Sequence, residues 1–331
     1  MPKVLITGIS GQDGAYLAKF LLDNGYAVWG TMQEGKAAAL GSLAALRLQE
    51  RVQLLPVDFT DVGSLRRVIE TAAPDEIYNL AAQSSVAESF KSPLQTGEIT
   101  GLGVARLLQA MREVKPDARF FQASSSEMYG LIQETPQTEQ TPFRPRNPYA
   151  VAKVYAHGMT VTYREAYHCH ASCGILFNHE SPLRPERFVT RKITAAVARI
   201  KHGLQSSLAL GNLDVERDWG FAGDYVEAMW RMLQQDEPDD YVIATGHIHS
   251  LREFVDLAFQ AVGLNYHDHV FVDPAFIRPT ETYAMVGCVD KAAARLGWRA
   301  QVTFQQLVEL LVEADIRRVL KDESNIRYTM E

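Results

Sequence analysis

The first strand-like run of the chain leads straight into a glycine-rich turn, and this junction restricts the fold more than any other feature. The apolar run Val4–Thr7 is followed by Gly8, Gly11 and Gly14, and helical spacing of apolar residues begins there. A tight turn from a strand into a helix needs glycine where other residues would be strained. The same change from strand period to helix period recurs through the first half of the chain.

This alternation predicts an α/β fold whose parallel sheet is built from right-handed strand–helix–strand units and covered by helices on both faces. The predicted strands are Val4–Thr7, Ala27–Thr31, Val52–Val57, Glu76–Leu80, Arg119–Ala123 and Ala171–Phe177. The predicted helices are Ala15–Asn24, Ser64–Ala73, Leu94–Val114 and Tyr149–Tyr167. The arrangement is a Rossmann-type doubly wound parallel sheet, which binds ligands at its carboxyl edge.

The second half is less regular and richer in proline, which predicts a smaller C-terminal α/β domain. Its predicted helices are Val189–Lys201, Asp224–Gln235, Leu251–Val262 and Phe304–Leu320, and its predicted strands are Ser207–Leu210, Tyr241–Ala244 and Val270–Val272. We expect residues 1–177 to form the Rossmann domain, to which the chain returns around residues 212–246. Residues 178–331 are expected to form an interleaved substrate domain over the carboxyl edge of the sheet.

Charge and cysteine content argue against several classes of protein. The 33 basic and 40 acidic residues give a net charge of −7 without a long Lys/Arg run, so nucleic acid and anionic membranes are poor candidate partners. Cys169, Cys173 and Cys288 are too few for a disulfide framework and suit a reducing compartment. The histidines beside Cys169 have no second ligand pair at zinc spacing, so we expect no metal. Without a signal peptide or an apolar run of about 18 residues, a cytoplasmic protein is expected.

The turn after the first strand predicts a site for a dinucleotide. Thr7–Gly14 reads Thr-Gly-Ile-Ser-Gly-Gln-Asp-Gly, a Gly-x-x-Gly-x-x-Gly pattern between a strand and a helix. Gly8 allows the tight turn, Gly11 lets backbone N–H groups approach a pyrophosphate, and Gly14 lets the helix pack closely on the sheet. The predicted cofactor ligands in this turn are Gly8, Ser10, Gly11, Gln12, Asp13 and Gly14.

A tyrosine and a lysine four residues apart predict proton-transfer chemistry. Tyr149 and Lys153 share one face of a predicted helix, so both side chains can enter one site. A nearby ammonium, with a positively charged nicotinamide, would favour the phenolate and lower the pKa of Tyr149. Ser124–Glu127 follows the fifth predicted strand, at the edge where a ligand of such a sheet lies.

These elements in this order resemble the extended short-chain dehydrogenase/reductase family of NAD(P)-dependent epimerases and dehydratases. Longer blocks resemble the GDP-mannose 4,6-dehydratase family over about residues 3–320. The blocks are Asn79–Ser84, Ser124–Gly130, Gly174–Pro182, Phe188–Ile193, Leu210–Asp214, Arg217–Gly220, Asp224–Trp230 and Arg278–Glu281. Related enzymes that act on dTDP-glucose tend to carry Asp at the place of Ser126, which favours a GDP-sugar here.

The resemblance implies a redox-neutral loss of water from a GDP-sugar, with Ser125, Glu127, Tyr149 and Lys153 as catalytic residues. Tyr149 would take the proton of the sugar 4-hydroxyl while hydride passes from C4 to the nicotinamide. Glu127 would remove the C5 proton that the new ketone acidifies, and would then assist the departure of water from C6. The hydride would return to C6 and leave a 4-keto-6-deoxy sugar.

The resemblance also implies ligands for both nucleotides. Further cofactor ligands would be Gln33, Asp58, Phe59, Leu80, Ala82, Gln83, Ser84, Tyr149, Lys153, His179 and Arg184, with Asp58 at the adenine amino group. Substrate ligands would be Ser84, Glu127, Asn178, Lys192, Arg217 and Arg278. The cationic members of the second set have the chemistry that a diphosphate requires.

Departures from the family pattern bear on the cofactor. Gln33 and Glu34 stand where the family has paired arginines that hold a 2′-phosphate and a neighbouring subunit. The cofactor is therefore NADP by family habit, with NAD as the alternative, because an acidic residue near this turn favours a free 2′-hydroxyl. Gln95 replaces a tyrosine that commonly contacts cofactor, whereas Ser125 stands for the usual Thr and keeps the hydroxyl.

The sequence leaves alternatives for the sugar substrate, for the reaction and for the number of subunits. Leu183 and Pro185–Arg187 differ from the pattern associated with mannose enzymes, so the same chemistry on a GDP-heptose is an alternative. A net sugar-nucleotide oxidoreductase or epimerase would leave Glu127 idle, and a nucleotide-sensing module would use none of the catalytic residues. The resemblance implies a homo-oligomer, either a dimer or a tetramer.

Overall fold

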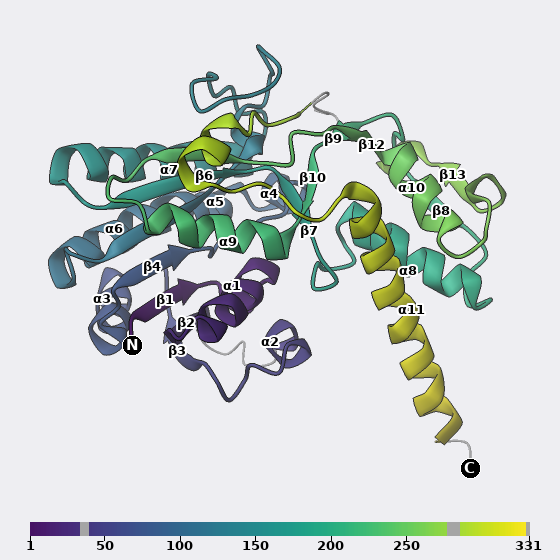
Figure 1. Cartoon of the computed structure of the whole chain (residues 1–331), viewed down its shortest axis with the longest axis horizontal. Coiled ribbons are helices and arrows are strands. Elements are labelled where there is room, and N and C mark those ends of the chain that lie inside the picture. Colours follow the sequence, from purple (N-terminus) through teal and green to yellow (C-terminus); the bar gives the residue numbers. More distant parts are fainter. Residues whose placement is uncertain (34–39, 277–284, 329–331) are drawn as a thin grey trace.

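Within the residues that the structure describes, seven parallel strands form one sheet in the order β11-β6-β5-β4-β1-β2-β3 (Figure 1). The computed structural model describes residues 1–33, 40–276 and 285–328, with side chains up to residue 321. The strands are β1 (Lys3–Thr7), β2 (Ala27–Gln33), β3 (Gln53–Val57), β4 (Glu76–Asn79), β5 (Arg119–Ser125), β6 (Ala171–Leu176) and β11 (Asp240–Ile243). The predicted α/β class is confirmed, and the first six strands lie within two residues of their predicted bounds.

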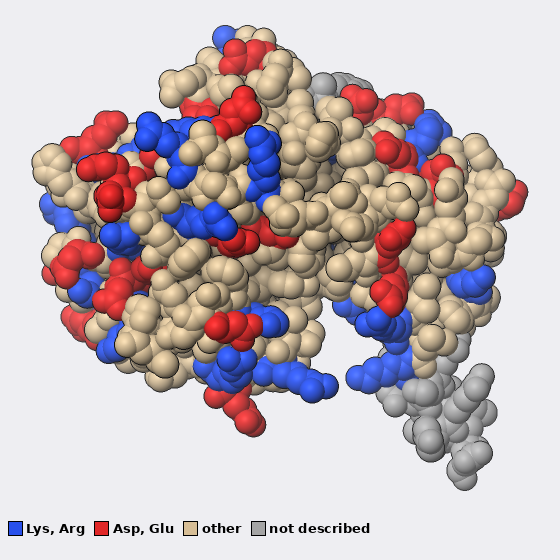
Figure 2. Space-filling model, viewed as in Figure 1, with Lys and Arg blue, Asp and Glu red and all other residues tan. Residues whose placement is uncertain are grey.

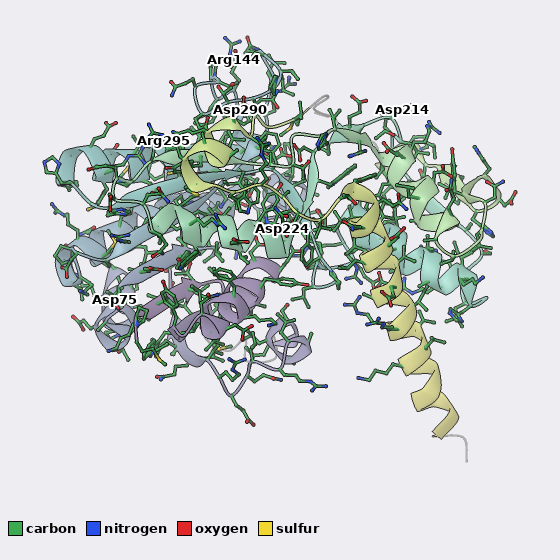
Figure 3. The ribbon with its side chains drawn as sticks, in the orientation of Figure 1. Asp75, Arg144, Asp214, Asp224, Asp290 and Arg295 are labelled. Carbon is green, nitrogen blue, oxygen red and sulfur yellow. The ribbon has the colours of Figure 1, made fainter. Side chains whose placement is uncertain are left out.

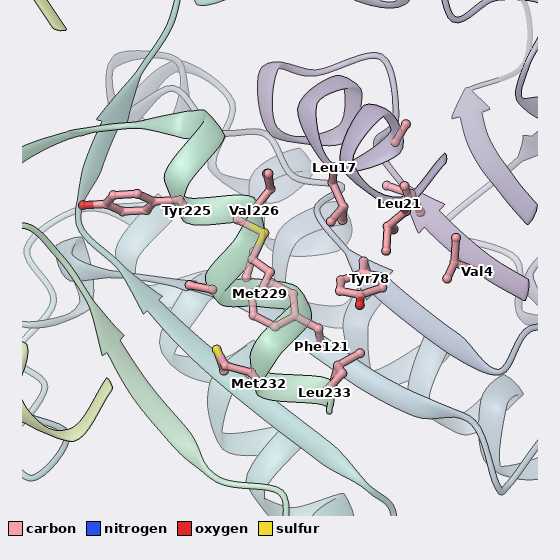
Figure 4. Close-up of a cluster of buried hydrophobic side chains, with 14 of the residues drawn as sticks. Val4, Leu17, Leu21, Tyr78, Phe121, Tyr225, Val226, Met229, Met232 and Leu233 are labelled. Carbon is pink, nitrogen blue, oxygen red and sulfur yellow. The ribbon is translucent and has the colours of Figure 1, made fainter. Parts of the chain in front are cut away.

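Helices cover both faces of the sheet. Alternate residues of a strand point to opposite faces, and they pack into two separate hydrophobic clusters there. Val4 and Ile6 join one cluster, whereas Leu5 between them joins the other. The first face carries α1 (Gln12–Asp23), α2 (Gly41–Ala45) and α9 (Ala222–Leu233), and the second carries α3 (Val62–Ala72), α6 (Gly103–Val114) and α7 (Pro148–Tyr167). Figure 4 shows Leu17 of α1 and Met229 of α9 meeting in the first cluster.

The connections from β1 to β2 and from β6 to β11 have opposite hands. They pass through α1 and α9, which pack together on one face, yet they cross the sheet in opposite directions. The right-handed rule, which was predicted for the units of the first half, therefore cannot hold for both connections. After β6 the chain builds the elements of residues 178–221 before it returns through α9, so this connection is not a simple crossover.

The single predicted helix Leu94–Val114 is wrong in detail, because the structure divides it. After α4 (Val86–Lys91) come α5 (Pro93–Thr96), a π-helix over Gly97–Leu102, and then α6. Thr100 Oγ1 accepts a hydrogen bond of 3.0 Å from the backbone N of Gln83. A Cβ on Gly103 would lie only 3.1 Å from the Phe59 ring. Such tertiary contacts favour a π-turn, which the hydrophobic period cannot distinguish from α-helix.

The remaining elements gather around a separate hydrophobic cluster, where α8 (Val189–Lys201), α10 (Leu251–Gln260) and α11 (Phe304–Tyr328) pack together. The paired strands are β7 (Asn178–Glu180) with β10 (Trp219–Phe221), β8 (Leu208–Leu210) with β13 (Val270–Val272), and β9 (Glu216–Arg217) antiparallel to β12 (His249–Ser250). Shorter helical turns are Ser126–Met128, Tyr266–Asp268, Pro274–Phe276 and the π-turn Ala292–Leu296. The predicted domain boundaries stay a prediction.

The surface carries both charges intermixed over the face seen in Figure 2. Figure 3 places Asp214 beside α10, where it pairs with Arg252 at 2.7 Å. Asp75 lies far from Asp214 in the same view, and it accepts a hydrogen bond of 2.8 Å from the backbone N of Lys3.

Among the described residues, no helix combines the length and the apolar character that a membrane span needs.

Candidate active site

The glycine-rich turn joins β1 to α1 as predicted. Gly8 has a φ of +70°, and the backbone N of Gly11 donates to the Gly8 carbonyl at 3.0 Å. A Cβ on Gly8 would lie 2.9 Å from the backbone N of Ala81, and a Cβ on Gly14 would lie 2.5 Å from the Gly8 carbonyl oxygen. Gly11 begins α1 without a side-chain cap, so the first N–H groups of the helix suit an anion.

Thr7 fixes the loop that follows β4, a role that the sequence reasoning missed. Its hydroxyl accepts hydrogen bonds from the backbone N of Leu80 and of Ala81, each at 3.1 Å. The same hydroxyl donates to Asn79 Oδ1 at 2.6 Å, and Asn79 Nδ2 donates to Gln122 Oε1 at 2.8 Å. The predicted cofactor ligands Leu80 and Ala82 therefore lie on a loop held against the glycine-rich turn.

Asp13 and His179 form a buried ion pair between α1 and β7. His179 Nε2 lies 3.0 Å from Asp13 Oδ2, and Gln12 beside them donates to the His179 carbonyl at 3.1 Å. Burial would raise the pKa of Asp13, but the charge and hydrogen bond of His179 outweigh it and lower that pKa to about 2. Burial would lower the pKa of His179, and the charge of Asp13 raises it instead. The structure thus brings together three of the predicted cofactor ligands.

Arg184 faces the same site. Its Nε atom is buried without a hydrogen-bond partner among the described residues and lies 3.3 Å from Glu180 Oε2. The guanidinium stacks 3.7 Å over the Phe188 ring. Its positive charge acts to lower the pKa of both Asp13 and Tyr149. A half-buried guanidinium with an unpartnered Nε beside a glycine-rich turn suits a diphosphate.

Ser125, Tyr149 and Lys153 meet where β5 ends and α7 begins. Lys153 Nζ donates to the Ala123 carbonyl at 2.6 Å and lies 5.8 Å from the centre of the Tyr149 ring. Burial lowers the pKa of Lys153 to about 8. Burial also raises the pKa of Tyr149 to about 12, and a hydrogen bond from Ser125 offsets this only in part. In the protein alone, desolvation of the phenolate therefore dominates, and the predicted lowering of the Tyr149 pKa, which includes the charge of a bound nicotinamide, stays a prediction.

Glu127 lies two residues beyond Ser125, in the turn Ser126–Met128. Its backbone N donates to Ser125 Oγ at 3.3 Å, and its Oε2 accepts a hydrogen bond of 2.9 Å from Asn147 Nδ2. Asn147 also caps α7, since its Oδ1 accepts from the backbone N of Ala150 at 2.8 Å. The sequence reasoning missed Asn147. An Asn before Pro148 signals a helix start, but it does not reveal the contact with Glu127.

A buried network lies behind these residues. Ser124 Oγ lies 3.1 Å from His157 Nδ1, and His157 Nε2 lies 3.7 Å from Asp240 Oδ2. Arg164 bonds both Asp240 oxygens, at 2.8 and 2.9 Å. His157, Cys173 and Asp240 could together offer metal ligands, but the guanidinium already occupies the carboxylate and would repel a cation. The sequence reasoning did not identify this network.

Gln33, Asp58 and Phe59 lie at the carboxyl ends of the neighbouring strands β2 and β3. Gln33 and Asp58 are exposed, and hydrogen bonds from Thr60 hold the pKa of Asp58 below its usual value. Phe59 is buried, and its carbonyl accepts a hydrogen bond of 3.4 Å from Arg106 Nη1. Glu34 lies outside the described residues.

Gln83 and Ser84 lie on the loop before α4. The Gln83 side chain folds back onto this loop, accepting from the backbone N of Ser85 at 2.7 Å and donating to Thr96 Oγ1 at 3.2 Å. Ser84 is exposed. The Gln83 amide therefore shapes the loop, and its predicted contact with cofactor stays a prediction.

Four of the predicted substrate ligands, Asn178, Lys192, Arg217 and Arg278, follow the predicted catalytic residues in the chain. Asn178 begins β7 directly after β6, and Arg217 ends β9. Lys192 of α8 donates to the Ala209 carbonyl at 2.7 Å and lies 3.7 Å over the Phe276 ring. Arg278 lies outside the described residues.

The sequence matches known proteins over nearly its whole length. The profile of the family described as GDP-mannose 4,6 dehydratase matches residues 5–311. GDP-mannose 4,6 dehydratase 1 of Arabidopsis thaliana is 49% identical over 329 residues, which cover 96% of this chain and 91% of that protein.

Solved structures with a similar fold bind nicotinamide dinucleotides according to their descriptions. RMD from Pseudomonas aeruginosa, complexed with NADPH, is 26% identical with a TM-score of 0.80 over 96% of this chain and 99% of that one. UDP-glucose 4-epimerase of Thermus thermophilus, complexed with NAD, is 28% identical with a TM-score of 0.80 over 94% of this chain and 98% of that one. The family match over residues 5–311 is decisive: the chain belongs to the GDP-mannose 4,6-dehydratase family.

Proposed function

We propose that this protein converts GDP-D-mannose to GDP-4-keto-6-deoxy-D-mannose and water, as a hydro-lyase with a bound nicotinamide cofactor. The observation that carries the proposal is Glu127, which lies beside Ser125 and is held by Asn147 at the start of the helix that bears Tyr149. Of the side chains, oxidation at C4 would need Ser125, Tyr149 and Lys153 alone, and a bound nicotinamide would supply the hydride acceptor. An added carboxylate supplies the second proton carrier that elimination requires.

The cofactor that fits this site is a dinucleotide. The uncapped start of α1, the close approach of Gly8 to Ala81 and the buried Nε of Arg184 together suit a pyrophosphate. When bound, it accepts a hydride from the sugar and returns it. We propose NADP by family habit, with NAD as the alternative that an exposed, uncharged Gln33 at the end of β2 favours.

The chain's own residues would move the protons. Tyr149 takes the proton of the 4-hydroxyl, with Ser125 hydrogen-bonded to its phenol and the Lys153 ammonium on the same face of α7. Because burial raises the Tyr149 pKa to about 12, the phenolate needs added positive charge beside it. Glu127 removes the proton at C5 and then supplies one to the departing C6 hydroxyl.

The GDP moiety would be held by Asn178, Lys192, Arg217 and Arg278. Arg217 offers a planar fork for phosphate oxygens. Partial burial removes water from the Lys192 ammonium and lowers its pKa, so a phosphate group would replace lost hydration there. Ser84, exposed at the loop before α4, is proposed to contact both ligands.

We also propose that the protein is a homo-oligomer. Phe90, Leu94, Val151 and Tyr155 are large apolar side chains with 52%, 85%, 55% and 42% of their surface exposed. They line a groove of about 770 Å³ between α4, α5 and α7. An exposed apolar surface of this kind is typical of an interface. Sedimentation should give a mass of at least two chains, and Val151→Glu should reduce it.

Incubation with GDP-mannose, without added reductant, tests the proposed activity. We expect a 4-keto-6-deoxy product and no net change in absorbance at about 340 nm, because the cofactor ends each turnover oxidised. A net change at that wavelength would indicate an oxidoreductase, and a product that keeps its C6 hydroxyl would indicate an epimerase. Turnover of a GDP-heptose but not of GDP-mannose would identify the heptose alternative.

A further inference from the structure

Asn147 joins two parts of the site that are far apart in the sequence. Its side chain is 7% exposed and lies between the first turn of α7 and the turn Ser126–Met128. One end of its amide contacts the backbone N of Ala150 at 2.8 Å, and the other contacts Glu127 Oε2 at 2.9 Å. One buried side chain thus spans the helix of Tyr149 and the carboxylate of Glu127.

The orientation of this amide is dictated by its partners. A backbone N–H can only donate, so the atom of Asn147 that faces Ala150 must be the oxygen. The NH₂ group then points to Glu127, where a carboxylate oxygen is the acceptor. The amide therefore cannot turn over without losing both the helix cap and this hydrogen bond.

We propose that Asn147 is a positioning residue that holds the Glu127 carboxylate in place for proton removal, while the same side chain caps the helix carrying Tyr149. The inference rests on the proposed function, since it assigns Asn147 to the acid–base step of that reaction. Asn147 acts through Glu127, and it is assigned no contact with the sugar.

The hydrogen bond from Asn147 holds Glu127 among other charged and titratable groups of the site. The turn of Glu127 packs on α7, where Tyr149 interacts electrostatically with it, and Lys153 follows one turn later. Arg184 and Asp13 also interact electrostatically with Tyr149. The amide donor at 2.9 Å fixes the position of the carboxylate oxygen that accepts it, and a general base must hold its oxygen within reach of the proton that it removes.

Two substitutions separate positioning from capping, because Ser and Asp are both good N-cap residues. Asn147→Asp keeps the cap oxygen but places a second carboxylate against Glu127, which should disfavour its ionisation. The acidic limb of the pH profile for C5 proton exchange should move up by at least about one pH unit, with the rate recovering at high pH. Asn147→Ser keeps the cap but cannot reach Glu127, and should slow C5 exchange roughly tenfold.

Asn265→Asp is the matched control. Asn265 caps the short turn Tyr266–Asp268 by accepting from the backbone N of His267 at 3.2 Å, and its side chain is exposed. The substitution adds the same charge at the same kind of cap, and it should leave the pH profile of C5 exchange unchanged.

The measurement is deuterium entry at C5 from heavy water, followed against pH, alongside reduction of bound cofactor in a single turnover. Asn147→Asp should leave the reduction step within about threefold of wild type, since Tyr149 and its helix cap remain. If both Asn147 variants keep the wild-type pH profile and exchange rate while wild type forms the dehydrated product, the positioning role is refuted and the function stands. If wild type forms no dehydrated product, the proposed function itself has failed.

Discussion

Glu127→Gln is the substitution that most sharply separates a dehydratase from an oxidoreductase. The glutamine keeps the length of the side chain, and its oxygen can still accept from Asn147 Nδ2, which lies 2.9 Å from the present carboxylate. The backbone hydrogen bond to Ser125 Oγ is unaffected. Because both contacts survive, the free energy of unfolding should change by less than about 1 kcal/mol. What is lost is the ability to carry a proton.

The expected kinetic loss follows from that single change. General acid–base catalysis is worth about 10²–10⁴ in rate. At about 1.4 kcal/mol per tenfold change, the barrier to elimination should rise by about 3–5 kcal/mol. The C4 step should survive, because Tyr149, Lys153 and Ser125 are untouched. Reduced cofactor should therefore accumulate with a 4-keto sugar that keeps its C6 hydroxyl.

Single-turnover absorbance at about 340 nm and mass spectrometry in heavy water measure the two steps separately. The variant should show a lasting rise in absorbance and no deuterium at C5. Near-normal formation of the 4-keto-6-deoxy product with C5 exchange would refute the assignment of Glu127 as the base. A variant that cannot reduce its cofactor either would mean that Glu127 also serves the C4 step.

Other substitutions test the two nucleotide sites and the buried ion pair. Gln33→Arg with Glu34→Arg should shift preference toward NADP by about 1–3 kcal/mol, measured by competitive binding, and no shift would mean that the 2′-phosphate is recognised elsewhere. Arg217→Ala should weaken GDP-sugar binding in calorimetry and leave cofactor retention intact, whereas equal loss of both would contradict its assignment to the substrate. Folding lowers the pKa of Asp13 from 3.8 to about 2, so the ionised carboxylate stabilises the folded state at pH values above 3.8. This stabilisation is lost as the pH falls toward about 2. Asp13→Asn should remove this component, so its deficit in unfolding free energy should shrink as the pH is lowered from about 5 to about 3, and a deficit independent of pH would exclude the ion pair with His179.

The parts of the fold with local signals could be predicted from the sequence. Strand and helix bounds follow from hydrophobic period, and the turn at Gly8 follows from a backbone conformation that only glycine adopts easily. The π-helix over Gly97–Leu102 could not be predicted, because Thr100 and Gly103 are fixed by Gln83 and Phe59, residues remote in the sequence. The opposite hands of the two crossovers are likewise set by a chain path that no local period records.

The candidate site likewise has features that local sequence predicts and features that depend on residues remote in the chain. Tyr149 and Lys153 could be paired because a helix places residues four apart on one face. The pKa of Tyr149 in the protein without cofactor could not be predicted, because it depends on how deeply the phenol is buried. Asn147 was recognisable as a helix start, but its contact with Glu127 depends on where β5 ends relative to α7.

The position of α7 against β5 depends in turn on the last strand of the sheet. Asp240 begins β11, binds Arg164 with both oxygens and faces His157, which reaches Ser124 beside Ser125. Removing this carboxylate would take away the ion pair of the half-buried Arg164 guanidinium and leave it the Ala171 carbonyl at 3.0 Å, which should destabilise the contact between α7 and β11. The helix α7 is therefore held in part by β11, a strand that the chain reaches only after its long path through residues 178–221. For this reason the geometry of the site is a property of the whole sheet and not of the motifs that compose it.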